Sequence, residues 1–348
     1  MPEQQKQLRV LVMRLSAMGD ILHALPAATA LREAHPEWWI GWAVEPQWKA
    51  LLVAEDALVR GPAMPLVDRV HVVPARQWAR SPLSAKTFRD VRRVRRELRE
   101  EKYDICIDLQ GAVRSAVIAR WACAKRLIGE DIPRERVARW FFTERMKTRG
   151  VHVIEQAIEV MNAVAGDALP VRLPLLPVDA EAERKADAMS EPFVVINPGA
   201  GWGAKRWPVE RYAAVATRLR DAGYGVVVNA GPGEESLAGE VAALSDGAAV
   251  ALRSSIAELI AVTRRASLVI AGDTGPLHLA CALGKPAVGI FGPTDPARNG
   301  PFGGRFRVLR HPESRRDHTR HAAPEAGLLT ITPDTVMDAA MELLKGSN

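Results

Sequence analysis

Residues 268–295 contain two short apolar runs separated by a polar, glycine-containing turn, and this pattern leaves few folds open. Leu268–Ala271 and Ala287–Phe291 are almost wholly apolar, which is typical of strands buried on both faces of a parallel sheet. Between them, Pro276–Leu283 has the length and composition of a short helix. The stretch therefore predicts a strand–helix–strand unit of a parallel α/β sheet.

The turn of this unit, Gly272-Asp-Thr-Gly275, places polar side chains at the carboxyl end of a strand. Asp273 or Thr274 is expected to cap the helix, and Pro276 suits its first turn. A helix N-terminus in this position offers N–H groups and the positive end of the helix dipole to an anion. His278 lies about one turn inside the helix and is expected to face the same ligand. The alternative is an ordinary capped unit without a ligand.

The same alternation of strand and helix runs through the chain. Further strands are expected at Arg9–Met13, Trp39–Val44, Arg69–Val73, Ile105–Leu109, Phe193–Asn197, Gly225–Asn229 and Ala248–Leu252. Helices are expected at residues 21–33, 84–101, 153–164, 179–190 and 334–344, and an exposed loop at residues 311–325. Repeated in this way, the alternation predicts doubly wound α/β architecture.

The chain is expected to form two such domains, because 348 residues are long for a single core. Prolines gather in Gly166–Pro177, which is interpreted as a linker between residues 1–170 and 178–348. Two doubly wound domains joined in this way predict a cleft between the carboxyl ends of their sheets. The C-terminal helix either completes the second domain or packs back on the first.

Composition excludes several classes of protein. No run approaches the roughly 18 apolar residues of a membrane span. Arg14 interrupts the first apolar run, so the N-terminus does not resemble a secretory signal. The three cysteines, Cys106, Cys123 and Cys281, are scattered and lack metal-ligand spacing, which favours a reducing cytoplasm over a disulfide scaffold.

Basic residues are concentrated in the first half of the chain. Residues 1–174 hold 28 Lys and Arg against 21 Asp and Glu, whereas the remainder holds 19 against 20. This excess suggests an anionic partner, whether a phosphorylated lipid, a membrane surface or nucleic acid, unless it is only a solvated face. No nucleic-acid-binding motif accompanies it, so no nucleic acid is expected.

Two segments carry much of this charge. Residues 84–101 are so rich in arginine that only a stripe of Phe88, Val91, Val94 and Leu98 is expected to be buried. Trp140, with Phe141 and Phe142 beside it, lies among basic residues and is a candidate contact with an anionic membrane.

Two more loops are expected to face the cleft. Ser16-Ala-Met-Gly-Asp20 follows the first strand, and Asp20 is either a helix cap or the general base of that domain. Asn197–Pro208 follows the first strand of the second domain. In it Gly199 and Gly201 let backbone N–H groups approach an anion, and Lys205 supplies a charge for phosphate.

A dinucleotide-dependent oxidoreductase is the main rival interpretation. The spacing of Gly199, Gly201 and Gly203 is GxGxG, whereas the dinucleotide fingerprint is GxGxxG. The next strand ends in Asn229, where that fingerprint places an acidic residue on the ribose. Both departures disfavour a dinucleotide site.

Five motifs in order along the chain resemble the bacterial lipopolysaccharide heptosyltransferases, and the first is most similar to heptosyltransferase I. They are Met18-Gly-Asp-Ile-Leu-His-Ala-Leu-Pro26, Tyr103-Asp-Ile-Cys-Ile-Asp-Leu-Gln-Gly111, Lys205-Arg-Trp-Pro208, Asp273-Thr-Gly-Pro-Leu-His278 and Phe291-Gly-Pro-Thr-Asp-Pro296. The resemblance implies a GT-B fold, with the acceptor on the N-terminal Rossmann-like domain and the nucleotide sugar on the C-terminal one. It also implies inverting, metal-independent and cofactor-free transfer of L-glycero-D-manno-heptose from ADP-heptose to a Kdo sugar linked to lipid A.

The resemblance assigns roles to individual residues. It makes Asp20 the general base and gives the ribose of the donor to Glu234. Residues implied for the donor's phosphates and heptose are Lys205, Asp273, Thr274 and Gly275, with His278 behind them. Candidates for binding the acidic acceptor are Arg76 and Arg80 on either side of Trp78, His23 and Gln110 in the shared motifs, and Arg134 and Arg136. The expected setting is the cytoplasmic face of the inner membrane, in peripheral contact with its anionic surface.

The chain also departs from the family pattern. Ala200 and Gly201 stand where hydroxyl residues are common ahead of the lysine, and Ala17 stands where a second serine is common. Phosphate binding then depends more on backbone N–H groups, and a related transferase using another ADP- or UDP-sugar stays an alternative. A non-catalytic nucleotide-sugar-binding protein is another, although the presence of both Asp20 and Lys205 argues against it, since a mere binder needs no base in the opposite domain.

Overall fold

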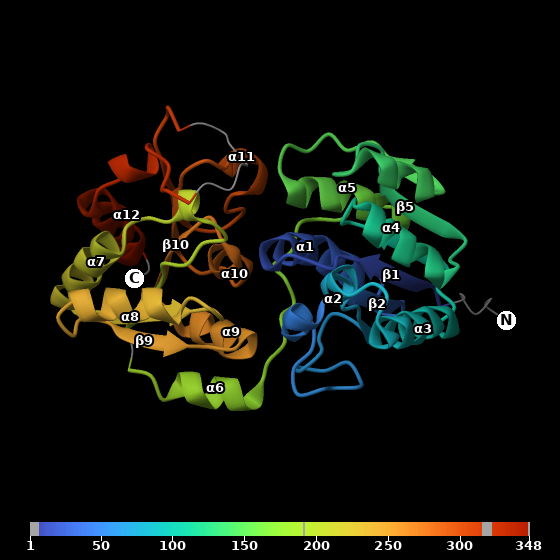
Figure 1. Ribbon diagram of the computed structural model, residues 1–348, viewed down its shortest axis with the longest axis horizontal. Helices are drawn as coiled ribbons and strands as arrows, with labels where there is room; N and C mark the ends of the chain where they lie inside the picture. The colour runs from blue at the N-terminus through green and yellow to red at the C-terminus, as the bar shows by residue number, and fades with distance from the viewer. Residues whose placement is uncertain (1–6, 191, 315–321, 347–348) are drawn as a thin grey trace. The chain divides into compact units, whose positions relative to one another are not determined.

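The computed structural model describes residues 7–190, 192–314 and 322–346, which form two compact units, Met1–Val178 and Asp179–Asn348 (Figure 1). Each unit contains one six-stranded parallel sheet covered by helices. The boundary falls at the end of the proline-containing stretch, where residues 168–179 have no helix or strand. Proline lacks the backbone N–H that regular structure uses, so repeated prolines favour an irregular connection there.

The sheet of the first unit has the strand order β3-β2-β1-β4-β5-β6. Its strands are β1 (Arg9–Met13), β2 (Trp39–Val44), β3 (Arg69–Val72), β4 (Ile105–Asp108), β5 (Arg126–Glu130) and β6 (Glu144–Met146). Its helices are α1 (Met18–Ala34), α2 (Ala75–Arg80), α3 (Ala85–Glu100), α4 (Val113–Ala119) and α5 (Val153–Ala165), with 3-10 turns η1 (Pro46–Leu51), η2 (Arg120–Ala122) and η3 (Arg136–Phe141). The order reverses direction at β1 and β4, which is where such sheets place their sites.

Burial on both faces explains why these strands are so apolar. Leu11 and Met13 of β1 pack against Val94 and Leu98 of α3 in one core cluster, while Val10 lies on the other face and is equally buried. Neighbouring strand residues point to opposite sides of a sheet. A strand with helices on both sides therefore needs a continuous apolar run.

The sheet of the second unit has the order β12-β11-β10-β7-β8-β9. Its strands are β7 (Phe193–Asn197), β8 (Gly225–Ala230), β9 (Val250–Arg253), β10 (Leu268–Gly272), β11 (Ala287–Phe291) and β12 (Phe306–Arg310). Its helices are α6 (Ala180–Asp187), α7 (Val209–Asp221), α8 (Glu235–Leu244), α9 (Ile256–Arg265), α10 (Gly275–Ala282), α11 (Pro296–Asn299) and α12 (Pro333–Lys345), with 3-10 turns η4 (Gly203–Lys205) and η5 (Leu328–Thr330).

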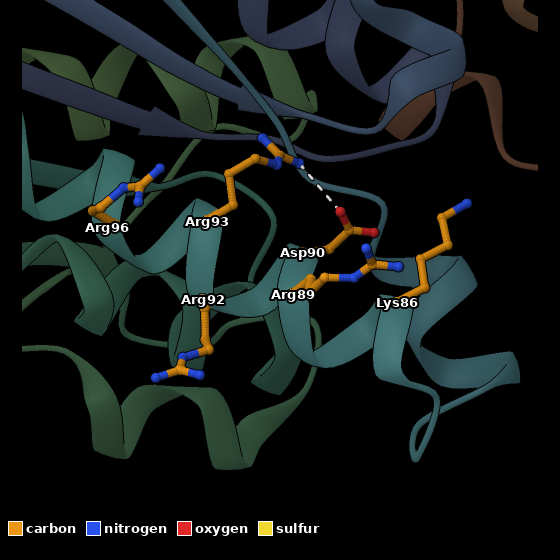
Figure 2. Close-up of a pocket in the computed structure, with 6 residues that line it drawn as sticks. All are labelled: Lys86, Arg89, Asp90, Arg92, Arg93 and Arg96. Carbon is orange, nitrogen blue, oxygen red and sulfur yellow. Dashed lines mark ion pairs between the residues drawn. The ribbon is translucent and has the colours of Figure 1, made fainter.

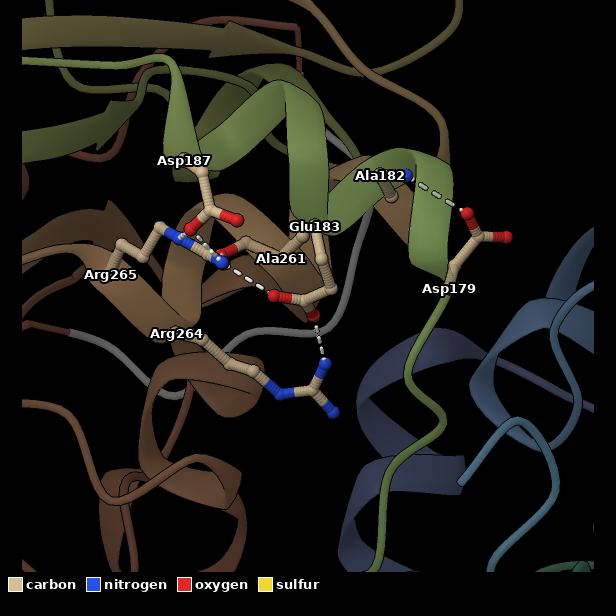
Figure 3. A network of polar contacts seen from close by, with 7 residues as sticks. All are labelled: Asp179, Ala182, Glu183, Asp187, Ala261, Arg264 and Arg265. Carbon is tan, nitrogen blue, oxygen red and sulfur yellow. Dashed lines mark hydrogen bonds and ion pairs between the residues drawn. The ribbon is translucent and has the colours of Figure 1, made fainter. Parts of the chain in front are cut away.

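Two cores lie on the two faces of this second sheet. Val194 and Ile196 of β7 join a cluster with α7, α8 and α12, whereas Phe193 and Val195 join a cluster with α6, α9 and α10. The C-terminal helix α12 packs against α7, β10, β11 and β12, so it completes the second unit. The helix α6 is joined to α9 by ion pairs of Glu183 with the arginines at the end of α9 (Figure 3).

Several expectations from the sequence are wrong in detail. Strands β5, β6 and β12 were not expected, and the first helix begins at Met18, so that Asp20 lies in its first turn. Phe88 was expected in the buried stripe of α3, but it is 57% exposed and Thr87 is buried instead. The expected loop at 311–325 lies partly outside the described residues, and its described portion has no helix or strand.

Candidate active site

Asp20 lies at the carboxyl edge of the first sheet, at the third position of α1. Its Oδ2 accepts a hydrogen bond of 3.1 Å from the Ala17 backbone N–H, and its Oδ1 lies 3.0 Å from the Arg14 Nη2. Arg14 is held in turn by the Leu109 carbonyl, to which its Nη1 donates. The carboxylate is 31% exposed, so both of its oxygens are oriented by the protein while it still reaches solvent.

The buried carboxyl of Asp108 helps to fix the loop between β1 and α1, which leads to Asp20. Asp108, at the end of β4, accepts hydrogen bonds from the backbone N–H groups of Gln110 (2.8 Å) and Gly111 (2.9 Å) and from the Ser115 hydroxyl. Burial raises the pKa of Asp108 to about 6, against the opposing effect of these hydrogen bonds. The Gln110 side chain accepts from the Leu15 N–H at 3.0 Å, so Gln110 fixes the loop that carries Asp20.

The arginines expected to bind the acceptor follow strands on either side of β1. Arg76 and Arg80 lie on α2, directly after β3, while Arg134 and Arg136 follow β5. Each of these strands is two positions from β1, or roughly 10 Å at the usual strand spacing. All four side chains are exposed. The same sheet edge therefore presents basic groups on both sides of Asp20.

These arginines differ in how firmly they are held. The Arg76 backbone N–H donates to Glu45 Oε1 at 3.2 Å, and its Nε lies 3.7 Å from the other oxygen of that buried carboxylate. Arg134 belongs to a loop that closes over Gly111, whose carbonyl accepts from the Glu135 N–H at 2.8 Å. His23 is buried, and its ring lies edge-on to the ring of His152 at 5.4 Å. It packs in the interior of the unit.

The second unit gathers its expected donor-binding residues at the end of β10. Lys205 Nζ forms an ion pair with Asp273 Oδ2 and donates to the Asp273 carbonyl at 3.3 Å, while His278 Nε2 lies 3.3 Å from Asp273 Oδ1. Burial raises the pKa of Asp273, but the hydrogen bond with His278 and the charge of Lys205 outweigh it and hold that pKa well below its usual range. The Lys205 ammonium also lies 4.4 Å from the centre of the Trp202 ring.

The start of α10 differs from the capped turn expected from the sequence. Neither Asp273 nor Thr274 caps it: the Asp273 carboxylate is engaged by Lys205 and His278, and the Thr274 hydroxyl donates to the Gly272 carbonyl at 3.2 Å. No side chain in the described part of the chain takes their place. This eight-residue helix therefore presents a first turn without a side-chain cap beside Lys205, whose side chain is 10% exposed.

Glu234 follows β8, directly before α8. Its carboxylate lies against the glycine-containing loop of residues 197–208, which follows β7. A Cβ on Gly199 would lie 2.2 Å from a Glu234 carboxylate oxygen, so Gly199 is required for their close approach, whereas Gly201 faces open space. Burial raises the pKa of Glu234. Beneath the loop, Asn229 Nδ2 donates to Asn197 Oδ1 at 2.8 Å, which joins the ends of β8 and β7.

A metal site and a membrane-crossing helix each need a particular arrangement of residues. Among the described residues, no group of three or more His, Cys, Asp or Glu side chains is arranged to hold a metal ion. Within the same residues, no helix has both the length and the apolar character needed to cross a membrane.

Sequence reasoning missed three residues of the first unit's site. Arg14 joins Asp20 to the Leu109 carbonyl, and the turn that Asp108 orders reaches the Leu15 N–H through Gln110, because β1 and β4 are neighbours, a pairing that the sequence does not specify. Arg114, in the first turn of α4, donates to the Ala75 carbonyl at 3.4 Å and so connects the ends of β4 and β3. Its position three residues after Gly111, within an expected helix start, was the available signal.

Comparison with known families and curated proteins gives one consistent result. Residues 91–328 match the family model for glycosyltransferase family 9 (heptosyltransferase). Lipopolysaccharide heptosyltransferase 1 of Pseudomonas aeruginosa is 32% identical over 301 residues, which cover 85% of this chain and 82% of that protein. Lipopolysaccharide heptosyltransferase 1 of Escherichia coli K12 is 29% identical over 325 residues, covering 88% and 94%.

Solved structures agree with these matches. The E. coli heptosyltransferase WaaC with ADP superimposes with a TM-score of 0.80 at 26% identity, covering 97% of this chain and all of that one. The same enzyme with ADP-2-deoxy-2-fluoro heptose gives a TM-score of 0.78 at 27% identity, covering 96% and 99%. E. coli heptosyltransferase II shares the fold, with a TM-score of 0.77 at 21% identity over 97% and 99%.

Proposed function

The chain belongs to glycosyltransferase family 9, the heptosyltransferases, and from this premise we propose that it is a heptosyltransferase I. It has the GT-B fold of that family and is a glycosyltransferase of lipopolysaccharide core biosynthesis. The proposed reaction moves L-glycero-D-manno-heptose from ADP-heptose to a Kdo sugar linked to lipid A. The relatives named heptosyltransferase 1 and the ADP-heptose analogue bound by WaaC support this choice of donor and step.

Asp20 is the proposed general base. A sugar hydroxyl is a weak nucleophile, so a carboxylate must take its proton as the new C–O bond forms. Asp20 suits this role because Arg14 and the Ala17 N–H orient its two oxygens while the carboxylate stays partly exposed. This orientation is the observation that carries the proposal. Single displacement on the anomeric carbon, without a covalent enzyme intermediate, then inverts its configuration.

The donor's diphosphate is assigned to Lys205 and the first turn of α10. ADP leaves with a developing negative charge, which the Lys205 ammonium and the uncapped N–H groups at the start of α10 stabilise. Asp273 keeps the lysine in place through its ion pair, and Glu234 is assigned to the ribose hydroxyls. On this assignment the reaction needs neither a metal ion nor a cofactor.

The acceptor is assigned to the first unit. Arg76, Arg80, Arg134 and Arg136 offer guanidinium groups that suit the carboxylates and phosphates of a Kdo-bearing lipid A. The lipid anchor of that acceptor places the enzyme at the cytoplasmic face of the inner membrane, in peripheral contact with anionic lipid.

Replacing Asp20 by Asn tests the proposal. D20N keeps the size of the side chain but removes the base, so we expect the turnover number with ADP-heptose and Kdo-lipid A to fall at least ~10²-fold. ADP affinity, measured by titration calorimetry, should change little. The matched control is D167N, which removes an exposed carboxylate in the segment leading to the second unit and should behave as wild type. Near-normal turnover by D20N excludes Asp20 as the base.

A further inference from the structure

The solvent-facing side of α3 carries an unusual density of positive charge. Between Ala85 and Glu100 the helix has seven basic residues and three acidic ones. Thr87, Val94 and Leu98 are buried in the unit, Asp90, Val91, Arg93 and Glu97 are half-buried, and the other side chains are exposed. Five of the basic residues and Asp90 line a groove of about 540 Å³ formed by this helix alone (Figure 2).

The three carboxylates neutralise only one side of the helix. Arg93 lies 2.9 Å from Glu97 and 3.9 Å from Asp90, and Arg96 lies 3.8 Å from Glu100. Figure 2 shows Arg92 extending from the opposite side of α3 to Arg93. Within residues 7–190, 192–314 and 322–346, no ion pair involves five of the helix's cations: Lys86, Arg89, Arg92, Arg95 and Arg99.

Exposed apolar side chains accompany these unpaired charges. Phe88, Arg92, Arg95 and Arg99 follow one another at spacings of four, three and four residues, which places them on one stripe of the helix. Phe88 is 57% exposed, and Leu83, just before the helix, is 86% exposed. Large apolar side chains beside a cationic helical face are typical of helices that lie on lipid.

We propose that the stripe of α3 formed by Phe88, Arg92, Arg95 and Arg99, together with Leu83, docks the enzyme on an anionic phospholipid bilayer. The arginines contact lipid phosphates, and the two apolar side chains enter the boundary between headgroups and acyl chains. Nucleic acid fits less well, because an aliphatic side chain such as Leu83 has no ring to stack on bases. The biological setting rests on the lipid-linked acceptor proposed above, but binding to lipid is independent of turnover.

The segment around Trp140 is the competing surface in the first unit. Trp140 is 75% exposed, but two of its neighbouring cations, Arg139 and Arg145, are already engaged. Arg139 lies 3.0 Å from Asp131, and the Arg145 guanidinium lies over the Trp140 ring at 5.6 Å and donates to the Arg139 carbonyl. Fewer free charges remain there than on α3.

Vesicle flotation of the full-length protein tests the proposal. Wild type should float with vesicles of phosphatidylglycerol and phosphatidylcholine, and not with pure phosphatidylcholine vesicles. One cation near an anionic surface changes partitioning about fivefold, so R92Q/R95Q/R99Q should reduce it on the order of a hundredfold. L83S/F88S should reduce binding while leaving the net charge unchanged. Added salt should weaken the binding of wild type.

Matched controls separate α3 from net charge and from the competing surface. R184Q/R220Q/K345Q removes three exposed positive charges from the second unit and should float as wild type. W140S/R145Q should also keep most of the binding. The proposal is overturned if R92Q/R95Q/R99Q floats normally, if the second-unit triple loses as much, or if the α3 triple loses affinity for an RNA duplex and not for vesicles. Turnover on a deacylated, water-soluble acceptor should persist in the α3 triple, which shows separately that the variant is folded.

Discussion

Lys205 neutralises the Asp273 carboxylate, and we propose that it also contacts the donor's phosphates. Replacing it by Met removes a charge-assisted contact worth about 1.5–3 kcal/mol, so ADP affinity should fall roughly 10- to 150-fold in titration calorimetry. Turnover should fall as well, because the contact exists in the ground and transition states alike. Among the described residues, the same change leaves His278 as the remaining side-chain partner of Asp273, so K205M should also unfold more easily.

A double variant separates the two effects of this substitution. In K205M/D273N the unpaired carboxylate is gone, so thermal stability should recover relative to K205M while ADP affinity stays low. Unchanged ADP affinity in K205M means that phosphate binding depends on backbone N–H groups alone. Recovery of affinity together with stability in the double variant would contradict a direct contact.

Asp108 gives the folded state a pH dependence with a definite sign. Its pKa is raised from an ordinary value near 3.8 to about 6, chiefly by burial. The folded protein therefore holds this proton more tightly than the unfolded chain, and the resulting stabilisation is complete below pH ~4. It is lost as the pH rises from about 4 to about 6, by up to about 3 kcal/mol.

The variant D108N removes this titration while keeping the hydrogen bonds from Gln110 and Gly111. The difference in unfolding free energy between wild type and D108N, measured by urea denaturation from pH 4 to pH 8, should move in favour of D108N as the pH rises. A difference that is constant over this range contradicts a raised pKa. D167N, which alters an exposed carboxylate, is the reference.

At the scale of elements, the central strands were predictable because they are apolar runs buried on both faces. Of the other strands, β6 and β12 escaped prediction for the converse reason, while β5 has only a short apolar run between Arg126 and Glu130. β6 has the sequence Glu-Arg-Met, and its Glu144 pairs with Arg126 of β5 at 2.7 Å, so its pairing partner is charged. Strands near a sheet edge are short and polar, which removes the hydrophobic signal that sequence reasoning uses.

The helix starts show a second limit of sequence reasoning. Ala17 occupies the N-cap of α1 and has no side chain that accepts a hydrogen bond, so the usual starting signal is missing. At α10 the usual residues are present, but Asp273 is drawn into an ion pair formed 68 residues away in sequence. Local sequence patterns correctly located the loops before α1 and α10. The partners of the side chains in these loops were not predictable, because they depend on which strands are neighbours in the sheet.

The uncapped start of α10 bears on the chemistry of the leaving group. Lys205 and this helix N-terminus offer the positive charge that a divalent metal supplies in other transferases. We therefore expect initial rates to be unchanged after dialysis against EDTA. Loss of turnover that magnesium or manganese restores would contradict this mechanism, and an added-calcium control would show whether any divalent ion suffices.

At the scale of the whole molecule, we propose two uses for the basic residues of the first unit. Those that follow β3 and β5 lie at the carboxyl edge of the sheet with Asp20, whereas those of α3 lie along a helix outside the catalytic loops. A few guanidinium groups that form bidentate contacts with carboxylates resist screening by salt. A broad charged surface is screened over about 8 Å at physiological ionic strength.

The two uses predict opposite responses to the form of the acceptor. R80A should raise the Michaelis constant for a deacylated, water-soluble acceptor, because Arg80 is expected to contact the acceptor's anionic groups directly. R92Q/R95Q/R99Q should leave that constant unchanged and raise it only when the acceptor is embedded in anionic vesicles, in a manner that added salt imitates in wild type. Initial rates with both acceptor forms at two salt concentrations distinguish the cases. If both variants are impaired equally on the soluble acceptor, α3 takes part in acceptor binding and the division between pocket and membrane surface is wrong.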